Sequence, residues 1–128
     1  VTSARVRDMH MRAQHGAAAE GLAAAFLVAR GLRVVGRNLR WPDGELDLVC
    51  EHGEVLVFVE VRLRRDKRFG GAAASVGPAK QARLIRAAQR YLAEQGRRAQ
   101  ARPARFDVVT LSGLDGTDIE WIRDAFGV

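Results

Sequence analysis

Cysteine, lysine and long apolar runs are scarce in this chain of 128 residues, and each scarcity excludes a class of protein. The single cysteine, Cys50, excludes an internal disulfide and is typical of a buried thiol in a reducing compartment. The longest apolar run, residues 21–29, is far too short to span a membrane, and no cleavage-site pattern follows it. We therefore expect a cytoplasmic protein with no membrane partner.

Several common site motifs are also missing. The sequence contains no phosphate-binding glycine loop, no nucleophile elbow, no zinc-ligand spacing and no internal repeat. Its length suits one domain with an ordinary hydrophobic core. We expect that domain to span residues 14–128, preceded by a flexible basic arm over residues 1–13.

Positive charge is abundant. The chain has 21 Lys and Arg against 15 Asp and Glu, a formal net charge of +6. Such a balance favours nucleic acid or an anionic membrane surface as the partner. Only two of the basic residues are lysines, Lys67 and Lys80, so an arginine-rich proteome would give a similar balance. Of these explanations we favour nucleic acid.

Two runs with strand character, residues 44–51 and 55–63, flank a short polar break. The first alternates polar and apolar residues, which predicts a half-buried strand. The second is almost wholly apolar and β-branched, which predicts a central strand covered on both faces. Glu60 and Arg62 are charges within that second run. Because burial of a lone carboxylate is costly unless it is paired or bound to a metal, Glu60 is the first candidate site residue.

The length of the loop between these runs decides whether Asp47 can reach Glu60. With residues 53–54 as the loop, Asp47 lies directly opposite Glu60; with residues 52–53, the two are diagonal neighbours. Opposed Cβ atoms stand about 4.5–5.5 Å apart, a spacing at which two carboxylates can hold Mg²⁺. A three-residue loop without a bulge would put the two acids on opposite faces.

Elements expected around this hairpin follow from periodicity and turn chemistry. They are a helix over residues 14–30, a strand over 32–40, a turn over 41–44, a basic loop over 64–77, a helix over 78–95, a basic connector over 97–105, and strands over 106–111 and 119–122. This order predicts an α/β fold in which helices flank a mixed central sheet.

Other charged and aromatic residues have competing explanations. Glu45 shares the expected face of Asp47, but we favour an exposed strand-end acid over a ligand. Asp107 is flanked by apolar residues, and we favour a structural acid bonded to backbone or arginine. We expect Trp121 and Phe126 to be packing residues. Cations of the basic loop and the second predicted helix could bind phosphates or could simply be solvated; they are Arg64, Arg65, Lys67, Arg68 and Arg83.

The acidic motifs occur in an order that resembles a known superfamily. Residues 44–48, Gly-Glu-Leu-Asp-Leu, precede residues 58–62, Phe-Val-Glu-Val-Arg; Glu20 lies on the preceding predicted helix and Lys80 opens the next. This pattern is similar to the signature of the PD-(D/E)XK nucleases. More narrowly, it resembles the small bacterial YraN-like proteins, predicted relatives of the archaeal Holliday-junction resolvases. The resemblance covers residues 14–126, including residues 105–109, but the lysine of the ExK motif is Arg62 here.

This resemblance implies a restriction-endonuclease-like αβββαβ(β) core and metal-dependent endonuclease activity on DNA, with branched DNA as one candidate substrate. It implies Mg²⁺ or Mn²⁺ held by Asp47, Glu60 and Glu20, with Arg62 and Lys80 completing the catalytic set. On the sequence alone Glu20 would be a solvated helix glutamate; the resemblance reverses that interpretation. Arg62 can stabilise phosphate charge, but it does not deprotonate in proteins and cannot serve as a base.

Two other functions remain open at this stage. The alternative to a nuclease is a catalytically inactive nucleic-acid-binding module of the same fold, which the presence of Arg62 favours. A third interpretation is a protein-interaction adaptor whose charges are solvated. DNA is the partner that we expect, and we allow for a homodimer.

Overall fold

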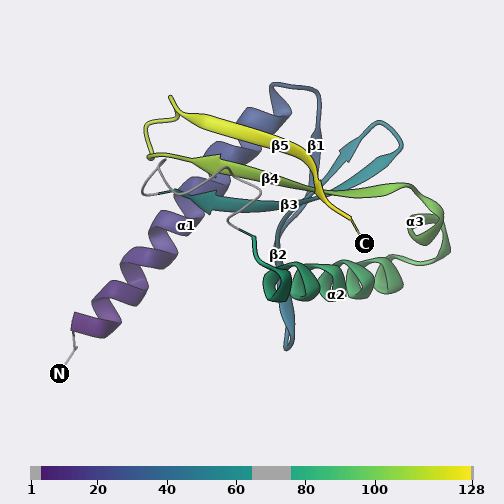
Figure 1. The fold of residues 1–128 in the computed structure, drawn as a ribbon, viewed down its shortest axis with the longest axis horizontal. Coiled ribbons are helices and arrows are strands. Elements are labelled where there is room, and N and C mark those ends of the chain that lie inside the picture. The colour runs from purple at the N-terminus through teal and green to yellow at the C-terminus, as the bar shows by residue number, and fades with distance from the viewer. Residues whose placement is uncertain (1–3, 65–75, 128) are drawn as a thin grey trace.

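The computed structural model describes residues 4–64 and 76–127, with side chains described from residue 16 onward. Its elements are α1 (Ala4–Val28), β1 (Arg33–Trp41), β2 (Gly44–His52), β3 (Val55–Leu63), α2 (Pro78–Gln95), α3 (Arg97–Ala101), β4 (Ala104–Leu111) and β5 (Ile119–Phe126). The strands form one sheet in the order β1-β2-β3-β4-β5 (Figure 1). Only the β3–β4 pairing among them is parallel, and α2 and α3 form its crossover. The expected α/β fold with a mixed sheet is therefore confirmed.

Element boundaries differ from expectation in three places. α1 begins at Ala4, ten residues before the helix expected from residue 14. Ala, Arg, Met and Gln are strong helix formers, and they extend the helix without a clear apolar stripe. The expected basic connector contains the short helix α3, and β5 continues to Phe126. None of the described helices is long and apolar enough to cross a membrane.

A hydrophobic cluster covers each face of the sheet. Ala19, Ala23 and Ala24 of α1 pack on one face, where their small side chains allow the helix to approach closely. Leu84 and Ala87 of α2 pack on the other face. β3 is buried between the two helices, as predicted for a central strand, and its residues alternate between the clusters. Glu60 consequently faces α2, on the same side as Phe58.

β2 twists sharply at Asp47. Leu48 packs in the cluster beneath α1, whereas Leu46 packs in the cluster beneath α2. Residues two apart on a regular strand would share a face, so the simple alternation expected for this strand breaks at Asp47. Opposite Asp47 in the paired strand β1, Asn38 has a left-handed φ of 50°, and a register irregularity follows Val34 nearer the start of that strand. Asp47 therefore lies where side chains from both helical layers can approach it.

Gly44 brings the start of β2 against α2. A Cβ atom added at Gly44 would lie 3.0 Å from the carbonyl oxygen of Arg83 and 3.3 Å from the Cβ of Ala87. Because glycine has no side chain, the strand can approach the helix this closely. α2 itself begins with Pro78, which suits the first helical turn. This contact places the first turn of α2 beside the acids of the hairpin.

Asp107 is the structural acid that its apolar neighbours predict. It is fully buried, and its carboxylate accepts hydrogen bonds from Arg105 Nε at 3.0 Å, Trp121 Nε1 at 3.0 Å and the Asp124 backbone N–H at 2.9 Å. These bonds join β4 to β5. Trp121 and Phe126 are packing residues, as expected, each partly buried against a core cluster.

Cys50 is a buried thiol, also as expected. It has no exposed surface, and burial raises the pKa of its thiol to about 12. A thiol with so high a pKa is a poor nucleophile, so Cys50 contributes to packing rather than to chemistry.

Candidate functional site

The β2–β3 hairpin has the register that brings Asp47 to Glu60. His52 pairs with Val55 and Leu48 pairs with Val59, so the loop consists of residues 53–54. Gly53 has a φ of 61°, as the first central residue of a type II′ turn requires. Continuation of this register places Asp47 directly opposite Glu60. Of the two loops compatible with the sequence, the structure has the one over residues 53–54, which gives the shorter distance between Asp47 and Glu60.

Asp47 and Glu60 oppose each other across the hairpin, and Glu20 of α1 lies near Asp47. Glu60 of β3 is 5% exposed, and the negative charge of Asp47 on β2 acts on its carboxyl group. The charge of Asp47 acts on Glu20 as well. Asp47 Oδ2 also accepts a hydrogen bond from the Val61 backbone N–H at 2.9 Å. The three residues assigned to the metal by resemblance are therefore neighbours, although they do not surround one point as a ready set of ligands.

Burial is the main cause that raises the pKa values of these acids. Burial, followed by the charge of Asp47, raises the pKa of Glu60 from an ordinary 4.5 to about 8, although Lys80 and Arg62 act in the opposite direction. Burial also raises the pKa of Asp47, against the hydrogen bond from Val61. The Asp47–Glu60 pair therefore holds a shared proton near neutral pH.

Two cations approach the same oxygen of Glu60. Lys80 Nζ in the first turn of α2 lies 3.6 Å from Glu60 Oε1, and Arg62 Nη1 lies 3.7 Å from it. Both side chains keep some exposure, 26% for Lys80 and 39% for Arg62. They can therefore contact the buried acid and a solvent-borne anion at the same time. The structure brings both predicted cations to the acidic cluster.

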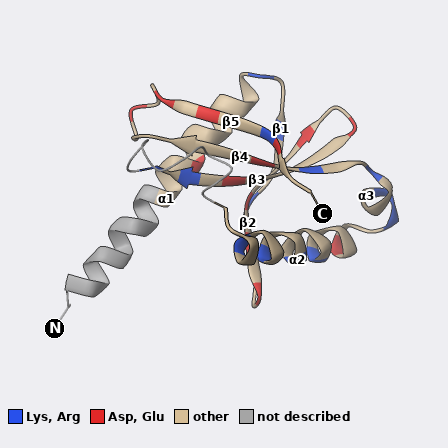
Figure 2. Ribbon diagram, viewed as in Figure 1, with Lys and Arg blue, Asp and Glu red and all other residues tan. Residues whose placement is uncertain are grey.

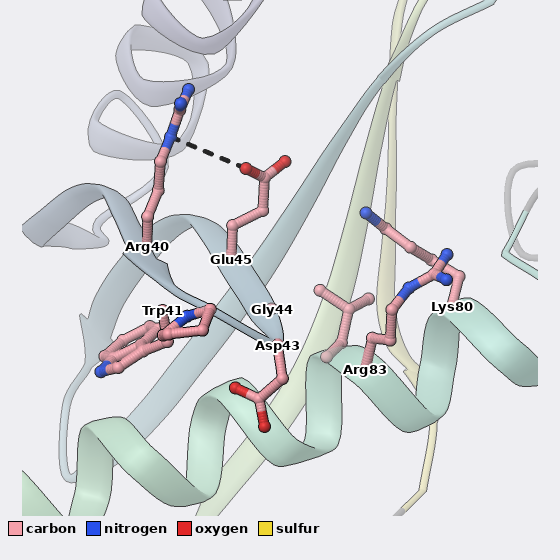
Figure 3. A pocket seen from close by; sticks show the side chains of 9 residues that line it. Arg40, Trp41, Asp43, Gly44, Glu45, Lys80 and Arg83 are labelled. Atoms are coloured by element: carbon pink, nitrogen blue, oxygen red, sulfur yellow. Dashed lines mark ion pairs between the residues drawn. The ribbon is translucent and has the colours of Figure 1, made fainter.

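A cleft of about 400 Å³ adjoins this cluster, between the β1–β2 turn and the start of α2 (Figure 3). Lys80 and Arg83 enter it from α2, and Arg40 pairs with Glu45 across its other side at 3.7 Å between Nε and Oε2. The Glu45 side chain is 50% exposed, consistent with a strand-end acid. Figure 2 shows further basic residues along α2. Lys80 lines the cleft and also contacts Glu60, so it connects the cleft to the buried acids.

Among the described residues that were predicted to bind phosphate, Arg64 does not line this cleft. Arg64 instead turns toward β5, where its Nη1 lies 3.2 Å from Glu120 Oε2 and its Nη2 donates to Ser112 Oγ at 3.4 Å. Arg65, Lys67 and Arg68 lie outside the described residues. Arg83 is exposed at the cleft and is therefore the predicted phosphate contact that the structure places best.

The paired carboxyls suit a hard divalent cation. Within residues 16–64 and 76–127, no three His, Cys, Asp or Glu side chains already surround one point as a set of metal ligands. Mg²⁺, however, commonly uses only one or two carboxylates and retains several waters. Asp47 and Glu60 supply those oxygens, and an ion between them would displace the shared proton. Glu20 lies near Asp47, beside that position.

Asn38 also belongs to the site, although the sequence gave no reason to select it. It lies opposite Asp47 in the β1–β2 ladder, and its side chain lowers the pKa of Glu20, against burial and the charge of Asp47. The available signal was a turn-type residue within a predicted strand, two positions after Gly36. That signal alone does not identify a partner on α1.

The shared proton predicts an unusual pH dependence of stability. Between about pH 4.5 and pH 8 the folded state retains a proton that the unfolded state has lost, so the free energy of unfolding should decrease as pH rises through this range. Glu60→Gln keeps a neutral side chain and should flatten this part of the curve. Urea denaturation in chelator at several pH values measures the effect. Glu45→Gln, at an exposed neighbouring acid, should retain the wild-type slope; parallel curves for wild type and Glu60→Gln would contradict the assignment.

Comparison with known proteins identifies the family. A profile described as "Uncharacterised protein family UPF0102" matches residues 19–111. The chain is 55% identical over 114 residues to a UPF0102 protein of Nitrosococcus oceani, covering 88% of this chain and 91% of the relative. It is 55% identical over 117 residues to one of Ralstonia nicotianae, with coverage of 88% and 86%. A relative from Methylobacillus flagellatus is 48% identical over 113 residues, with coverage of 88% and 96%. The chain therefore belongs to the UPF0102, or YraN-like, family.

Proposed function

We propose that this protein is a metal-dependent endonuclease that hydrolyses phosphodiester bonds in DNA, with branched DNA as one candidate substrate. The observation that carries the proposal is the buried Asp47–Glu60 carboxyl pair, with Lys80 and Arg62 on one of its oxygens. The element order, one helix, three strands, two helices and two strands, also supports a restriction-endonuclease-like core, because it matches the order that the motif resemblance implies.

A comparison with Asp107 shows why the pair is more than structural. Asp107 is buried, but fixed donors from arginine, tryptophan and backbone surround its carboxylate. Asp47 and Glu60 instead face each other; burial raises the pKa of both, and the charge of Asp47 further raises the cost of ionising Glu60. Such an arrangement lowers stability at neutral pH unless a cation offsets it. Perturbed acids beside a cleft are characteristic of functional sites.

Asp47 and Glu60 would hold Mg²⁺ or Mn²⁺, with Glu20 supporting the ion directly or through water. When bound, such an ion polarises a phosphoryl oxygen and lowers the pKa of a coordinated water. The protein fixes the positions of the two carboxylates through the hairpin register and the Val61 N–H. Burial of Glu60 keeps this part of the site away from bulk water.

We assign the functions of the single lysine of the ExK motif to Arg62 and Lys80 together. The planar guanidinium of Arg62 suits phosphate oxygens and stabilises the negative charge that develops during hydrolysis. It cannot exchange a proton at physiological pH. Lys80 brings an ammonium group to the same Glu60 oxygen. Substitution at position 62 therefore leaves an amine within the site.

The second candidate is a binding module that has kept the fold and lost cleavage, and the observation that favours it is Arg62 itself. Such a protein would bind DNA with the same salt dependence but would show no divalent-metal requirement for product formation. An adaptor that binds proteins would lack the steep salt dependence of phosphate binding. The metal dependence of product formation and the salt dependence of DNA binding therefore distinguish the three functions.

The first prediction for this function concerns Arg62. With Mn²⁺, wild type should cut DNA, Arg62→Lys should cut equally fast or faster, and both should bind DNA within a few-fold. Arg62→Ala should lose about 10²–10³ in rate, as when one transition-state donor is removed. Time courses on linear, nicked and branched DNA measure these rates, with Asp47→Asn and chelator as controls. If wild type and Arg62→Lys are inert with both Mg²⁺ and Mn²⁺, the binding module replaces the nuclease.

A second prediction concerns Arg83. Arg83→Ala should weaken binding similarly across DNA sequences and reduce the slope of log affinity against log salt by about one. Arg65→Ala, in the basic loop, carries the same expectation. Fluorescence anisotropy with Ca²⁺ in place of Mg²⁺ measures binding. Arg123→Ala on β5, where the guanidinium lies over Trp121, removes the same charge away from the cleft and should have little effect. Unchanged affinity at low salt in both test variants would favour the adaptor.

A further inference from the structure

We propose that a hollow at the C-terminal end of α2, lined by Arg33, Arg98 and Arg102, is a second phosphate-binding site that holds the DNA backbone away from the acidic pair. This arginine hollow has a volume of about 300 Å³. The inference deepens the proposed function and rests on it, because DNA is the partner in both. It does not require that the DNA be cleaved.

The arginine hollow lies along the same seam of the fold as the cleft beside the acids. Arg40 of the edge strand β1 and Arg83 of α2 line that cleft. Arg33 of β1 and Tyr91 of α2 line the arginine hollow. α2 extends about 18 Å from residue 83 to residue 95, at about 1.5 Å per residue. Because each strand of B-DNA advances about 3.4 Å per nucleotide, phosphates about five nucleotides apart on one DNA fit both positions.

Positive charge exceeds negative charge in the arginine hollow. Glu51 is the acid among its lining residues, and it pairs with two of the arginines. Arg33 Nη2 lies 2.7 Å from Glu51 Oε1, and Arg102 Nη1 lies 2.6 Å from Glu51 Oε2. Arg98 is exposed and makes no ion pair with any other residue that the structure describes. Three guanidinium groups against one carboxylate leave an excess of two positive charges for an anion.

Arg102 is held in place before any ligand binds. Its Nε donates to the Glu54 carbonyl at 3.0 Å, and its Nη2 donates to the Gly53 carbonyl at 3.3 Å. A guanidinium group has five N–H donors, so some remain for an anion after these bonds and the bond to Glu51. A donor that is already fixed loses little conformational freedom when it binds phosphate, which favours binding.

Exposed arginines of α2 connect the cleft to the arginine hollow. Arg83, Arg86 and Arg90 are three and four residues apart, so they share one face of the helix. Figure 2 shows that basic residues continue from α2 to α3. Asp43, an acid beside this face, is already paired with Arg90 at 2.9 Å between Oδ1 and Nε. Charge complementarity therefore favours a polyanion that extends over both positions.

The competing explanation is a structural bridge that only ties β1 and the end of α3 to the hairpin. Glu51 between Arg33 and Arg102 is sufficient for such a bridge, whereas a third arginine beside them adds repulsion. A structural bridge therefore predicts no effect of Arg98 on DNA binding. Because Arg98 is exposed, its replacement leaves the core intact. Arg102 is a less suitable test, because its removal would also free the hairpin turn.

Three single variants of the intact chain test the proposal. Arg98→Gln removes the charge and Arg98→Lys retains it. Arg97→Gln is the matched control, because Arg97 is an exposed neighbour on α3 that does not line the arginine hollow. Fluorescence anisotropy measures binding to a duplex of about 16 base pairs, longer than the required span, with Ca²⁺ at several salt concentrations.

Arg98→Gln should bind roughly tenfold more weakly, as for loss of one charge-assisted hydrogen bond, and should reduce the slope of log affinity against log salt by about one. Arg98→Lys should restore the slope, because counterion release depends on charge. Arg97→Gln should resemble wild type. The double variant Arg83→Ala with Arg98→Gln should lose about two from the slope, because the two arginines contact different phosphates of one DNA.

Each outcome decides a different claim. Equal effects of Arg98→Gln and Arg97→Gln, no effect of either, or no restoration by Arg98→Lys overturns the arginine hollow while DNA binding by wild type stands. A double variant that binds as well as Arg83→Ala alone overturns simultaneous contact with one DNA. If wild type does not bind DNA at low salt, the proposed function and this DNA site are both overturned. DNA binding without cleavage in Mn²⁺ overturns the nuclease alone, and the Arg98 variants still decide the role of the hollow.

Discussion

Two buried carboxyl groups that face each other are the constraint on which the site depends. Asp47 and Glu60 oppose each other because the β2–β3 hairpin turns over two residues, and burial lifts the pKa of Glu60 to about 8. Gly44 admits α2 close enough for Lys80 to contact Glu60, and the small residues of α1 bring Glu20 to Asp47. The helices α1 and α2 therefore each place one charged side chain beside this pair.

The two cations and the neighbouring acids make the site electrostatically incomplete. Lys80 and Arg62 lie 3.6 Å and 3.7 Å from Glu60 Oε1, longer than close ion pairs, and both remain partly exposed. At neutral pH a proton offsets part of the repulsion between the acids. A divalent ion would offset it more completely and would leave both cations available for phosphate. The same pair of buried acids therefore lowers the stability of the metal-free protein and provides oxygen ligands for a divalent ion.

Much of this arrangement could be predicted from the sequence because it depends on local rules. The polar break at residues 52–54 indicated a two-residue turn at either 52–53 or 53–54, and the alternation of side chains then put Asp47 on the same face as Glu60 for both loops. Contacts between residues distant in sequence could not be predicted in the same way. Arg64 was expected near phosphate, but its partner Glu120 lies on β5.

Periodicity reveals neither the left-handed backbone at Asn38 nor the break that places Leu46 and Leu48 in different core clusters. Helix at residues 4–13 was missed because helix propensity there acts without an apolar stripe. The predictions that failed are therefore those in which tertiary contacts or backbone conformation override the local pattern.

Proton release on metal binding tests the central claim most directly. Mn²⁺ would be titrated calorimetrically into the protein at pH 7 in buffers that differ in ionisation enthalpy, which gives the number of protons released per ion. Because Glu60 has a pKa of about 8, we predict release of about one proton at pH 7 and progressively less at more alkaline pH. Absence of Mn²⁺ binding, or binding without proton release at pH 7, would contradict a metal site built on Asp47 and Glu60.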